Sequence, residues 1–557
     1  MNTSRKSGIL LHITSLPCTY GIGSLGKAAF DFVDFLSASR TGLWQILPIG
    51  PTGYGDSPYQ SFSSFAINPL LIDFDDLVQR GWAEQKDASA PTYIKNIGKT
   101  RVDYGKVVAW KTGALQKLSQ GFLSSITNPD SKPDFPSDAK AQFYAFCREN
   151  MFWLKDYAAF MSIKHYYDEQ ARLESEQKGE YVNGMWNAYW PKPLALHEDQ
   201  AVEEWINSHT EDFLSQEVIQ FFAFSQWKAL RNYANSKNVE IIGDIPIFVS
   251  PDSSDVWSNR QLFCLDNDGV PIDVAGVPPD YFSREGQLWG NPLYDWMAMK
   301  ADGFKWWIER IKNMLTLTDY VRVDHFRGFA GSWAVPYGSA NAVNGKWIKN
   351  PGEELFCAIK NALGDLPLIA EDLGIITDDV RALRDKFGFP GMKILQFAFD
   401  LNEAENGSLQ NGFLPHNFDT SNCVAYTGTH DNDTLKGWFE TLNDDLLALI
   451  ASYVSGRECK AQEAQSLKRR GVLRKELIRL AFSSSARFAI IPIQDLYNVG
   501  SEGRMNTPAT DRANWSWRMS RSHLYGSLAE RKTRELAELN MLYGRSAPEA
   551  KEEKSEE

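Results

Sequence analysis

The feature that most constrains the fold is a series of eight short apolar segments separated by stretches of helical periodicity. A segment that is apolar for four to eight residues and ends in Gly, Pro or a polar residue is typical of a strand buried on both faces. Between several of them, for example at 27–39 and 303–315, apolar residues recur three and four positions apart, as along an amphipathic helix. Alternating strands and helices predict an α/β fold, here a (β/α)8 TIM barrel. The predicted strands are residues 8–14, 42–49, 239–249, 320–328, 367–374, 392–399, 423–431 and 488–495.

Two intervals between the predicted strands are longer than a helical crossover needs. Residues 74–237 separate the second and third strands and are expected to be mainly helical, with one amphipathic helix over residues 139–167. Residues 250–300 separate the third and fourth strands and are expected to form an extended loop. We therefore predict a single domain over residues 1–557 with two insertions, ending in a disordered acidic tail at residues 546–557.

Composition and charge exclude several classes of protein. With 43% hydrophobic residues the chain can bury a large core, which excludes disordered and collagenous proteins. The net charge of -13 opposes binding to nucleic acid or to an anionic membrane surface. No stretch approaches the roughly 20 apolar residues that span a bilayer. We expect an uncharged substrate and neither a nucleic-acid nor a membrane partner.

The cysteines favour a reducing compartment. They are far apart and form neither a CxxC pair nor a Cys/His cluster, so they predict no disulfide framework and no zinc site. The N-terminal string GILLHITSL is short and is interrupted by His12, which favours a strand over a signal peptide. A cytoplasmic location is therefore expected. The six cysteines are Cys18, Cys147, Cys264, Cys357, Cys423 and Cys459.

Carboxylates lie at the ends of four predicted strands, at the edge of the barrel where enzymes of this fold place their chemistry. They are Asp244, Asp324, Glu371 with Asp372, and Asp431. Any one of them could be a helix cap or part of a structural ion pair. Their convergence on one rim favours a catalytic site.

Two of these acids are expected to differ in charge. Arg322 lies two residues before Asp324, so strand alternation turns both side chains to the same face, where the guanidinium would keep the carboxylate ionised. Glu371 follows the apolar run 367–370 and would keep its proton nearer neutral pH. One charged carboxylate and one neutral acid form the pair that retaining glycoside chemistry requires. The alternative is a buried Arg–Asp pair that only stabilises the barrel.

Two histidines adjoin the strand-end carboxylates, and a metal site is one interpretation. His325 follows Asp324 and His430 precedes Asp431, and two histidines with three carboxylates could ligate a divalent ion. Arg322 beside these groups would repel a cation, so hydrogen bonding to substrate hydroxyls is the favoured role. We therefore expect no metal ion.

A glycine motif near the N-terminus raises the question of a cofactor. The string GIGSLG at 21–26 matches GxGxxG between a predicted strand and a predicted helix. A dinucleotide fingerprint also needs an acidic residue about 20 positions later, at the end of the second strand. That strand instead ends in PIGP, so we interpret the motif as a tight turn and expect no cofactor.

Long strings spread over most of the chain resemble the 4-α-glucanotransferases, also called amylomaltases or disproportionating enzymes, which are relatives of the α-amylase barrels. The strings are rich in unusual residues, so the resemblance is more specific than any single barrel motif. They are LLHITSLP and GIGSLG near the start, LPIGPTGYGDSPYQSFSSFAINP at 47–69, GDIPIFV from Gly243, AGVPPDYFSREGQLWGNPLYDW from Ala275, RVDHFRGF from Arg322, AEDLG from Ala370, YTGTHDNDT from Tyr426, and GRMNTPATDRANWSWR near the end.

This resemblance implies roles for individual residues. Asp324 would be the nucleophile, Glu371 the general acid/base, and Asp431 the stabiliser of the transition state. The remaining positions would bind substrate, and the loop within 250–300 would cover it. They are Ser57, Tyr59, Asp244, Arg322, His325 and His430 around the glucan, Asp280, Gln287 and Trp289 in the covering loop, and Asn506 in RMNTP.

The resemblance also implies an activity. The enzyme would transfer α-1,4-glucan segments between maltooligosaccharides by a retaining double displacement through a covalent glucosyl-enzyme, releasing glucose, with glucose or maltose as acceptor. An α-1,4-glucan hydrolase of the same fold is the nearest alternative. A non-catalytic glucan-binding barrel would be expected to lack one of the three acids, and a metal-dependent lyase would be sensitive to EDTA.

Overall fold

The computed structural model describes residues 5–128, 135–279, 283–374, 376–402, 409–510 and 513–548. Its centre is a sheet of eight parallel strands in the order β10-β11-β12-β1-β2-β3-β6-β9. The amide of Ala370, at the end of β9, donates to the carbonyl of Pro390, just before β10, at 2.9 Å, so the two edges of the sheet meet. The strands are β1 (Lys6–Leu10), β2 (Leu43–Gln45), β3 (Glu240–Pro246), β6 (Tyr320–Asp324), β9 (Leu368–Ala370), β10 (Gly391–Ile394), β11 (Cys423–Tyr426) and β12 (Phe488–Pro492).

Each strand overlaps one of the eight predicted segments, so the predicted (β/α)8 barrel is confirmed. The strands are shorter than the apolar segments because the chain leaves the hydrogen-bonded ladder while it is still buried. After β1, for instance, the chain forms the 3-10 turn Ile13–Ser15, and after β10 it forms the turn Leu395–Phe397. Ile13 and Leu395 are fully buried, which explains why apolarity alone placed the strand ends too late.

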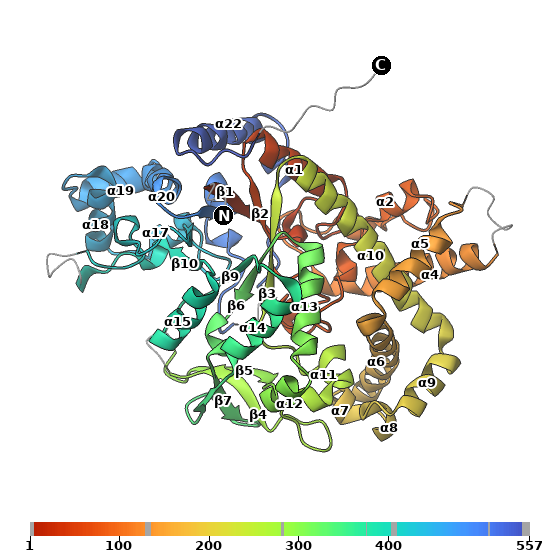
Figure 1. Cartoon of the computed structure of the whole chain (residues 1–557). Helices are drawn as coiled ribbons and strands as arrows, with labels where there is room; N and C mark the ends of the chain where they lie inside the picture. The colour runs from red at the N-terminus through yellow and green to blue at the C-terminus, as the bar shows by residue number, and fades with distance from the viewer. Residues whose placement is uncertain are drawn as a thin grey trace.

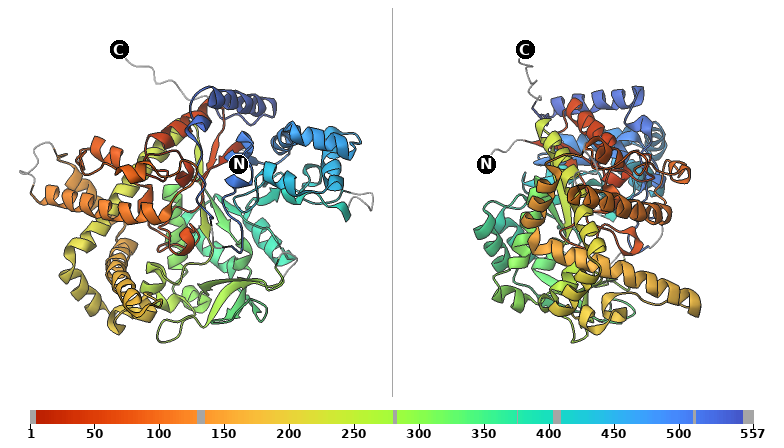
Figure 2. Two further views of the ribbon diagram at one scale, coloured as in Figure 1. Left: turned by 180° about the vertical axis from the view of Figure 1, so that it is seen from behind. Right: turned by 90° about the vertical axis from the view of Figure 1, so that its right-hand side faces the viewer.

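Helices surround the barrel (Figure 1). The helices predicted at 27–39 and 303–315 are confirmed as α1 (Lys27–Ala38) and α13 (Lys305–Leu317). α18, α19 and α20 lie on the opposite side of the barrel from the helices of the first insertion, as Figure 2 also shows. The other helices outside the insertions are α14 (Gly352–Leu363), α15 (Asp378–Phe387), α17 (Leu435–Thr441), α18 (Asp444–Ser455), α19 (Ala461–Arg469), α20 (Val472–Ser483), α21 (Ile493–Tyr497) and α22 (Ser527–Leu542).

The first long interval, between β2 and β3, forms helices, and its last helix packs on the barrel. α10 (Thr210–Ser236) contacts α1 and β3 as well as α4 and α6, so one helix belongs to both the interval and the barrel wall. The single helix predicted at 139–167 is wrong: Asn150 ends one helix there and begins the next. The other helices are α2 (Phe74–Gln79), α3 (Thr92–Lys95), α4 (Tyr104–Thr127), α5 (Ala139–Glu149), α6 (Met151–Lys178), α7 (Trp186–Tyr189), α8 (Lys192–Ala195) and α9 (Asp199–Ser208).

The second long interval contributes to a small antiparallel sheet that the sequence analysis missed. Its four strands lie in the order β5-β4-β7-β8, and two of them come from the segment that follows β6. β4 and β5 are short and pair with a shifted register, and β4 pairs on its other side with the distant β7, so strand alternation gives little local signal there. The strands are β4 (Asp273–Val277), β5 (Gln287–Pro292), β7 (Gly331–Pro336) and β8 (Lys346–Lys349), with helices α11 (Ser254–Ser258) and α12 (Trp296–Ala301) nearby in the chain.

Two further sequence predictions, the disordered tail and the single domain, are not tested by the structure. In the tail at 546–557, residues 549–557 lie outside the described residues, so its disorder stays a prediction, as does the assignment of the chain to one domain. Among the described helices, none is both long enough and apolar enough to cross a membrane.

Candidate active site

A buried arginine organises one side of the barrel mouth. Arg322 on β6 lies opposite Asp244 on β3 in the parallel register, so their side chains meet inside the barrel. Nη1 of Arg322 donates to both carboxylate oxygens of Asp244 at 2.8 and 2.7 Å, and Nη2 donates to Oδ1 of Asp324 at 2.7 Å. Arg322 and Asp244 are 2% and 1% exposed, so water screens their charges little.

This arginine keeps its charge. Burial lowers the pKa of Arg322, but the carboxylates of Asp244 and Asp324 oppose that effect and hold the pKa well above its ordinary value. Its two terminal nitrogens donate to different carboxylates, and such charge-assisted hydrogen bonds are stronger than those between neutral groups. Asp324 therefore lies against a permanent positive charge, as the spacing of Arg322 and Asp324 predicted.

The next strand places a second acid beside this pair. Glu371 follows β9, which pairs with β6, and the Glu371 amide donates to the carbonyl of Val323 at 3.1 Å. Its carboxyl oxygens accept from the backbone amides of His325 at 2.9 Å and Leu373 at 3.0 Å. His325 has a left-handed φ of 53°, so the chain turns sharply after Asp324 and brings the His325 amide to Glu371.

Glu371 differs from Asp324 in its surroundings, because backbone amides rather than a guanidinium hold its carboxyl group. Burial and then the negative charge of Asp324 raise the pKa of Glu371, while Arg322 and the Leu373 amide only partly oppose the rise. Glu371 is therefore a neutral acid near neutral pH, next to a carboxylate held by a guanidinium. A carboxylate paired with a guanidinium and a carboxylic acid whose pKa is raised are able to take different catalytic roles.

Asp431 lies across the mouth in the loop after β11. Its Oδ1 accepts from Nδ2 of Asn506 at 2.7 Å, and Oδ2 lies 3.3 Å from Nε2 of His430. Its side chain is 43% exposed, in contrast to the buried Arg322 and Asp244. This carboxylate is thus open to a ligand and is held by residues from the C-terminal part of the chain.

Tyr59 connects the two sides. Its hydroxyl donates to Oδ2 of Asp244 at 2.9 Å and lies 3.0 Å from Nε2 of His430, on which its ring stacks at 5.3 Å. Burial lowers the pKa of His430, so this imidazole is neutral, and the geometry fits a proton on Nε2 donated to the tyrosine oxygen. A continuous set of polar contacts therefore runs from Asp324 through Arg322, Asp244, Tyr59 and His430 to Asp431.

The structure also places the predicted covering residues. The ring of Trp289 on β5 meets His325 edge to face at 4.8 Å, and its Nε1 donates to Oε1 of Gln287 at 3.2 Å. Ser57 accepts from the backbone amide of Tyr59 at 3.3 Å, so it shapes the turn that carries this tyrosine. Asp280, predicted for the same covering loop as Trp289, lies outside the described residues.

Not every strand-end acid belongs to this cluster. Asp372 accepts from Nη1 of Arg384 at 2.5 Å and from the backbone amide of Met392 at 2.7 Å, so it joins α15 to β10. Asp372 is therefore part of a structural ion pair, the alternative that the sequence left open for each strand-end acid.

The glycines of GIGSLG also have a packing explanation. Gly21 has a φ of 79°, and a Cβ on Gly23 would lie 1.9 Å from the carbonyl oxygen of Ile13.

Sequence reasoning missed two residues that contact the cluster. The indole of Trp515 lies 5.7 Å from the ring of Tyr59 and 5.9 Å from that of His430. Nη2 of Arg504 donates to the backbone carbonyl of Asp431 at 2.6 Å. Both follow the last strand, where barrel periodicity gives no signal; the string GRMNTPATDRANWSWR contains them but does not single them out.

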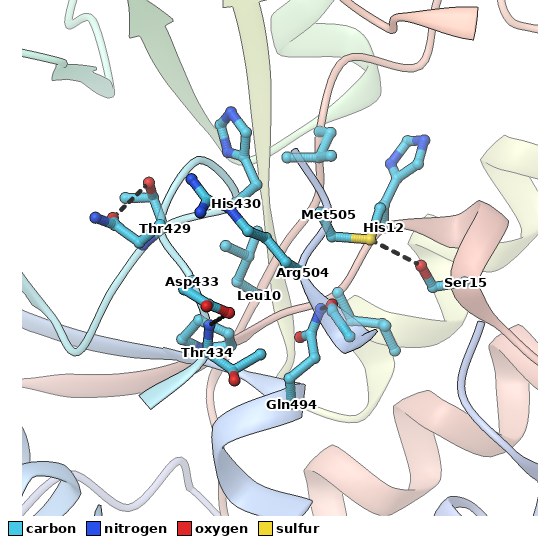
Figure 3. A pocket seen from close by; sticks show the side chains of 15 residues that line it. Leu10, His12, Ser15, Thr429, His430, Asp433, Thr434, Gln494, Arg504 and Met505 are labelled. Carbon is cyan, nitrogen blue, oxygen red and sulfur yellow. Dashed lines mark hydrogen bonds between the residues drawn. The ribbon is translucent and has the colours of Figure 1, made fainter. Parts of the chain in front are cut away.

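A hollow lies next to His430 (Figure 3). Its walls come from the segment after β1 with His12, from the loop with Thr429, and from Arg504 and Met505.

In the described parts of the chain, no group of three or more His, Cys, Asp or Glu side chains has the arrangement to hold a metal ion.

An eight-stranded barrel with a guanidinium-paired carboxylate, a carboxylic acid of raised pKa on the adjacent strand, and a third, half-exposed carboxylate after another strand is typical of enzymes that act on glycosidic bonds. The family model for 4-alpha-glucanotransferase matches residues 11–523. The chain therefore belongs to the 4-alpha-glucanotransferase family.

Individual relatives agree over the whole length. The chain is 44% identical to the 4-alpha-glucanotransferase of Synechocystis, with 98% of this chain and 99% of the relative covered. It is 44% identical to that of Thermus thermophilus, with 93% and 95% covered. The solved amylomaltase of Streptococcus agalactiae in complex with acarbose superposes with a TM-score of 0.85 at 37% identity, covering 97% of this chain and all of that one.

Proposed function

We propose that this enzyme transfers α-1,4-glucan segments between maltooligosaccharides by a retaining double displacement. The observation that carries the proposal is the contrast on adjacent strands: Asp324 is held by Arg322, while burial raises the pKa of Glu371. A retaining enzyme needs such a pair, with carboxyl groups about 5–5.5 Å apart. Membership of the 4-alpha-glucanotransferase family supports transfer over the hydrolytic alternative.

In the first displacement, an oxygen of Asp324 attacks the anomeric carbon while Glu371 gives its proton to the departing glycosidic oxygen. The glycosidic bond breaks, a glucosyl ester forms, and the shortened sugar leaves with a free 4-hydroxyl. Glu371, now ionised, then takes a proton from the 4-hydroxyl of an acceptor as that oxygen attacks the ester. Two inversions leave a new α-1,4 bond and regenerate Asp324.

The other groups act on the substrate rather than on protons. Asp431 would bind ring hydroxyls, and these hydrogen bonds strengthen as the ring flattens toward an oxocarbenium ion. Arg322 donates to Oδ1 of Asp324 and would hold this carboxylate in place as it forms the ester and leaves in the second step. The neutral imidazole of His325 can donate to a sugar hydroxyl, and His430, whose Nε2 proton goes to Tyr59, is proposed to contact the glucan beside it.

Transfer requires that a sugar reach the ester before water does. The ring of Trp289 lies over His325, the residue that follows the nucleophile, so this part of the small sheet adjoins the reacting centre. An indole ring there would stack on an acceptor sugar and exclude water. Asp280 and Gln287 are proposed to bind hydroxyls of the same acceptor, with Ser57 binding the glucan nearby and Asn506 acting through Asp431.

Incubation with maltotriose tests the activity. Transfer yields glucose together with longer oligosaccharides at a constant number of reducing ends, whereas hydrolysis increases that number. Asp324→Ala should abolish both glucose release and chain lengthening, while Asp378→Asn, at a fully exposed carboxylate on α15, should leave them unchanged. Increasing reducing ends without longer products would establish the hydrolase instead.

The remaining partners follow from the same chemistry. Glucose or maltose is proposed as acceptor, because both present the 4-hydroxyl that the second step needs. We also propose a cytoplasmic location without a nucleic-acid partner, supported by the net charge of -13 and by six free cysteines. No cofactor or metal ion takes part in the proposed steps.

A further inference from the structure

Arg504 joins the two loops that carry Asp431 and Asn506. Its Nη2 donates to the backbone carbonyl of Asp431 at 2.6 Å, and its Nε donates to the backbone carbonyl of Asn506 at 2.7 Å. One planar guanidinium therefore fixes two carbonyl groups from segments 75 residues apart in the sequence. In Figure 3 its side chain extends toward the loop that holds Thr429 and His430.

The same two loops meet in the contact that orients the exposed carboxylate. The Asn506 amide donates to the carbonyl of His430 at 3.1 Å, and the Asn506 side chain donates to Oδ1 of Asp431 at 2.7 Å. Asp431 lies beyond the end of β11, so no strand pairing fixes its backbone. A shift between the loops would rotate the carboxylate away from Asn506 while the barrel itself stayed intact.

We infer that Arg504 is a positioning residue for Asp431: it sets the separation of the two loops, so that Asn506 holds one carboxylate oxygen and leaves the other for the substrate. The inference rests on the proposed role of Asp431 in stabilising the transition state. Positioning of this kind acts on kcat more than on substrate binding, because the hydrogen bonds concerned strengthen in the transition state.

Arg504→Met removes both donors and keeps much of the apolar length. We expect kcat for maltotriose disproportionation to fall on the order of 10- to 100-fold with KM nearly unchanged, as small displacements of catalytic groups do. Arg504→Lys, which can reach one carbonyl, should recover part of the loss. Arg101→Met is the matched control, because Arg101 donates to the carbonyls of Ala513 and Glu502 in the same C-terminal segment without contacting Asp431. Thermal unfolding of each variant shows whether it is folded.

A double-mutant cycle shows whether Arg504 acts through the Asn506 contact. In the Asn506→Ala background, Arg504→Met should reduce kcat much less than in the wild type. Affinity for a maltooligosaccharide δ-lactone, whose flattened ring resembles the transition state, should weaken in Arg504→Met while affinity for maltotriose is kept. An unchanged kcat, an equal loss in both backgrounds, or an equal loss in Arg101→Met overturns the inference.

Asp431→Asn separates this inference from the proposed function. If Asp431→Asn is nearly inactive while Arg504→Met is fully active, the positioning role is wrong and the proposed mechanism stands. If Asp431→Asn retains full activity, the mechanistic role of Asp431 falls, and the inference about Arg504 falls with it.

Discussion

The two sides of the barrel mouth are built in different ways. On one side, Asp324 and Glu371 end adjacent strands, and strand register together with buried hydrogen bonds fixes where they lie. On the other side, Asp431 has a half-exposed side chain and lies in a loop whose place depends on Asn506 and Arg504. The strand side is set by the barrel, and the loop side by contacts between distant segments.

This difference matches the chemistry that we propose for each side. Proton transfer and nucleophilic attack need fixed geometry at one carbon atom, which strands of a barrel provide. Binding a sugar ring whose shape changes during the reaction needs an accessible group, which a loop provides. Changes on the strand side should therefore reduce turnover most, and changes on the loop side should reduce it by smaller, graded amounts.

The largest effect is expected at the nucleophile. Asp324→Asn removes the negative charge that attacks the anomeric carbon but keeps the size of the side chain. We expect kcat to fall by roughly 10⁴-fold or more, as for nucleophiles that act as part of a unit. The measurement is glucose release from maltotriose, and a covalent glucosyl adduct detected by mass spectrometry should be absent. An adduct formed at the normal rate would assign the nucleophile elsewhere.

The next effect is expected at the acid/base, and it depends on pH. Glu371→Gln should lower kcat by roughly 10²–10⁴-fold, the contribution of a positioned proton donor. In the wild type, kcat/KM should decline on the alkaline side as Glu371 ionises, because burial raises its pKa. A wild-type profile that stays flat well into the alkaline range would contradict the assignment.

The same shift in pKa predicts a change in stability. The pKa of Glu371 in the folded protein lies above that of the unfolded chain, so its contribution to stability is present at low pH and is lost as the pH rises through the folded value. Glutamine does not ionise. The Tm of the wild type should therefore decline relative to that of Glu371→Gln as the pH rises from the acidic range, where the unfolded chain ionises, to about 8, and the two should run parallel above that value. A constant difference in Tm between the acidic range and pH 8 would argue against a raised pKa.

Breaking the link between the two sides should have an intermediate effect. Tyr59→Phe removes the hydroxyl that joins Asp244 to His430. We expect kcat to fall about tenfold, the effect of roughly 1.4 kcal/mol on the barrier. Tyr426→Phe is the control, because it removes a buried tyrosine hydroxyl that donates to Gln45 at 2.9 Å inside the barrel. Equal losses of activity in the two variants would assign the Tyr59 effect to stability alone.

The smallest effect on turnover is expected at a buried carboxylate below the loop. Asp495 accepts from the hydroxyl of Thr427 at 2.6 Å and from the amide of Leu435 at 2.7 Å, so it anchors both ends of the loop that carries Asp431. Asp495→Ala leaves two buried donors unpaired and should cost about 1–3 kcal/mol for each in stability. Thermal unfolding measures this loss, and kcat at low temperature should change little. A large loss of kcat at an unchanged Tm would make Asp495 part of the loop's positioning.

The sequence predicted the strand side well, because each of its residues has a local signal. An apolar run ending in a carboxylate marks Glu371, and alternation along one strand pairs Arg322 with Asp324. Ser57, Tyr59 and Trp289 needed the resemblance to a family, since no pattern of their own singles them out. Arg504 and Trp515 could not be predicted. Arg504 donates to a backbone carbonyl, which every residue has, and Trp515 contacts the rings of Tyr59 and His430 from a loop without periodicity.

The small sheet shows the same limit for the fold. β4 pairs with β7, and their sequences lie more than 50 residues apart on either side of β6. Periodicity describes which face of a segment is buried but not which distant segment covers it. The neighbours of the barrel strands could be predicted, because strands that alternate with helices usually pair in the order of the sequence.

The parallel pairing of β1 with β12 means that β1, at residues 6–10, gains its second neighbour only after residues 488–492 have been synthesised. Until residues 488–492 emerge from the ribosome, the edge of β1 that later pairs with them is open, and such an edge can pair with other chains. Asn506 and Arg504 emerge later still. A nascent chain that contains Asp324 and Glu371 but not yet Arg504 and Asn506 lacks the groups that hold Asp431, so efficient activity should appear only after these two residues have emerged.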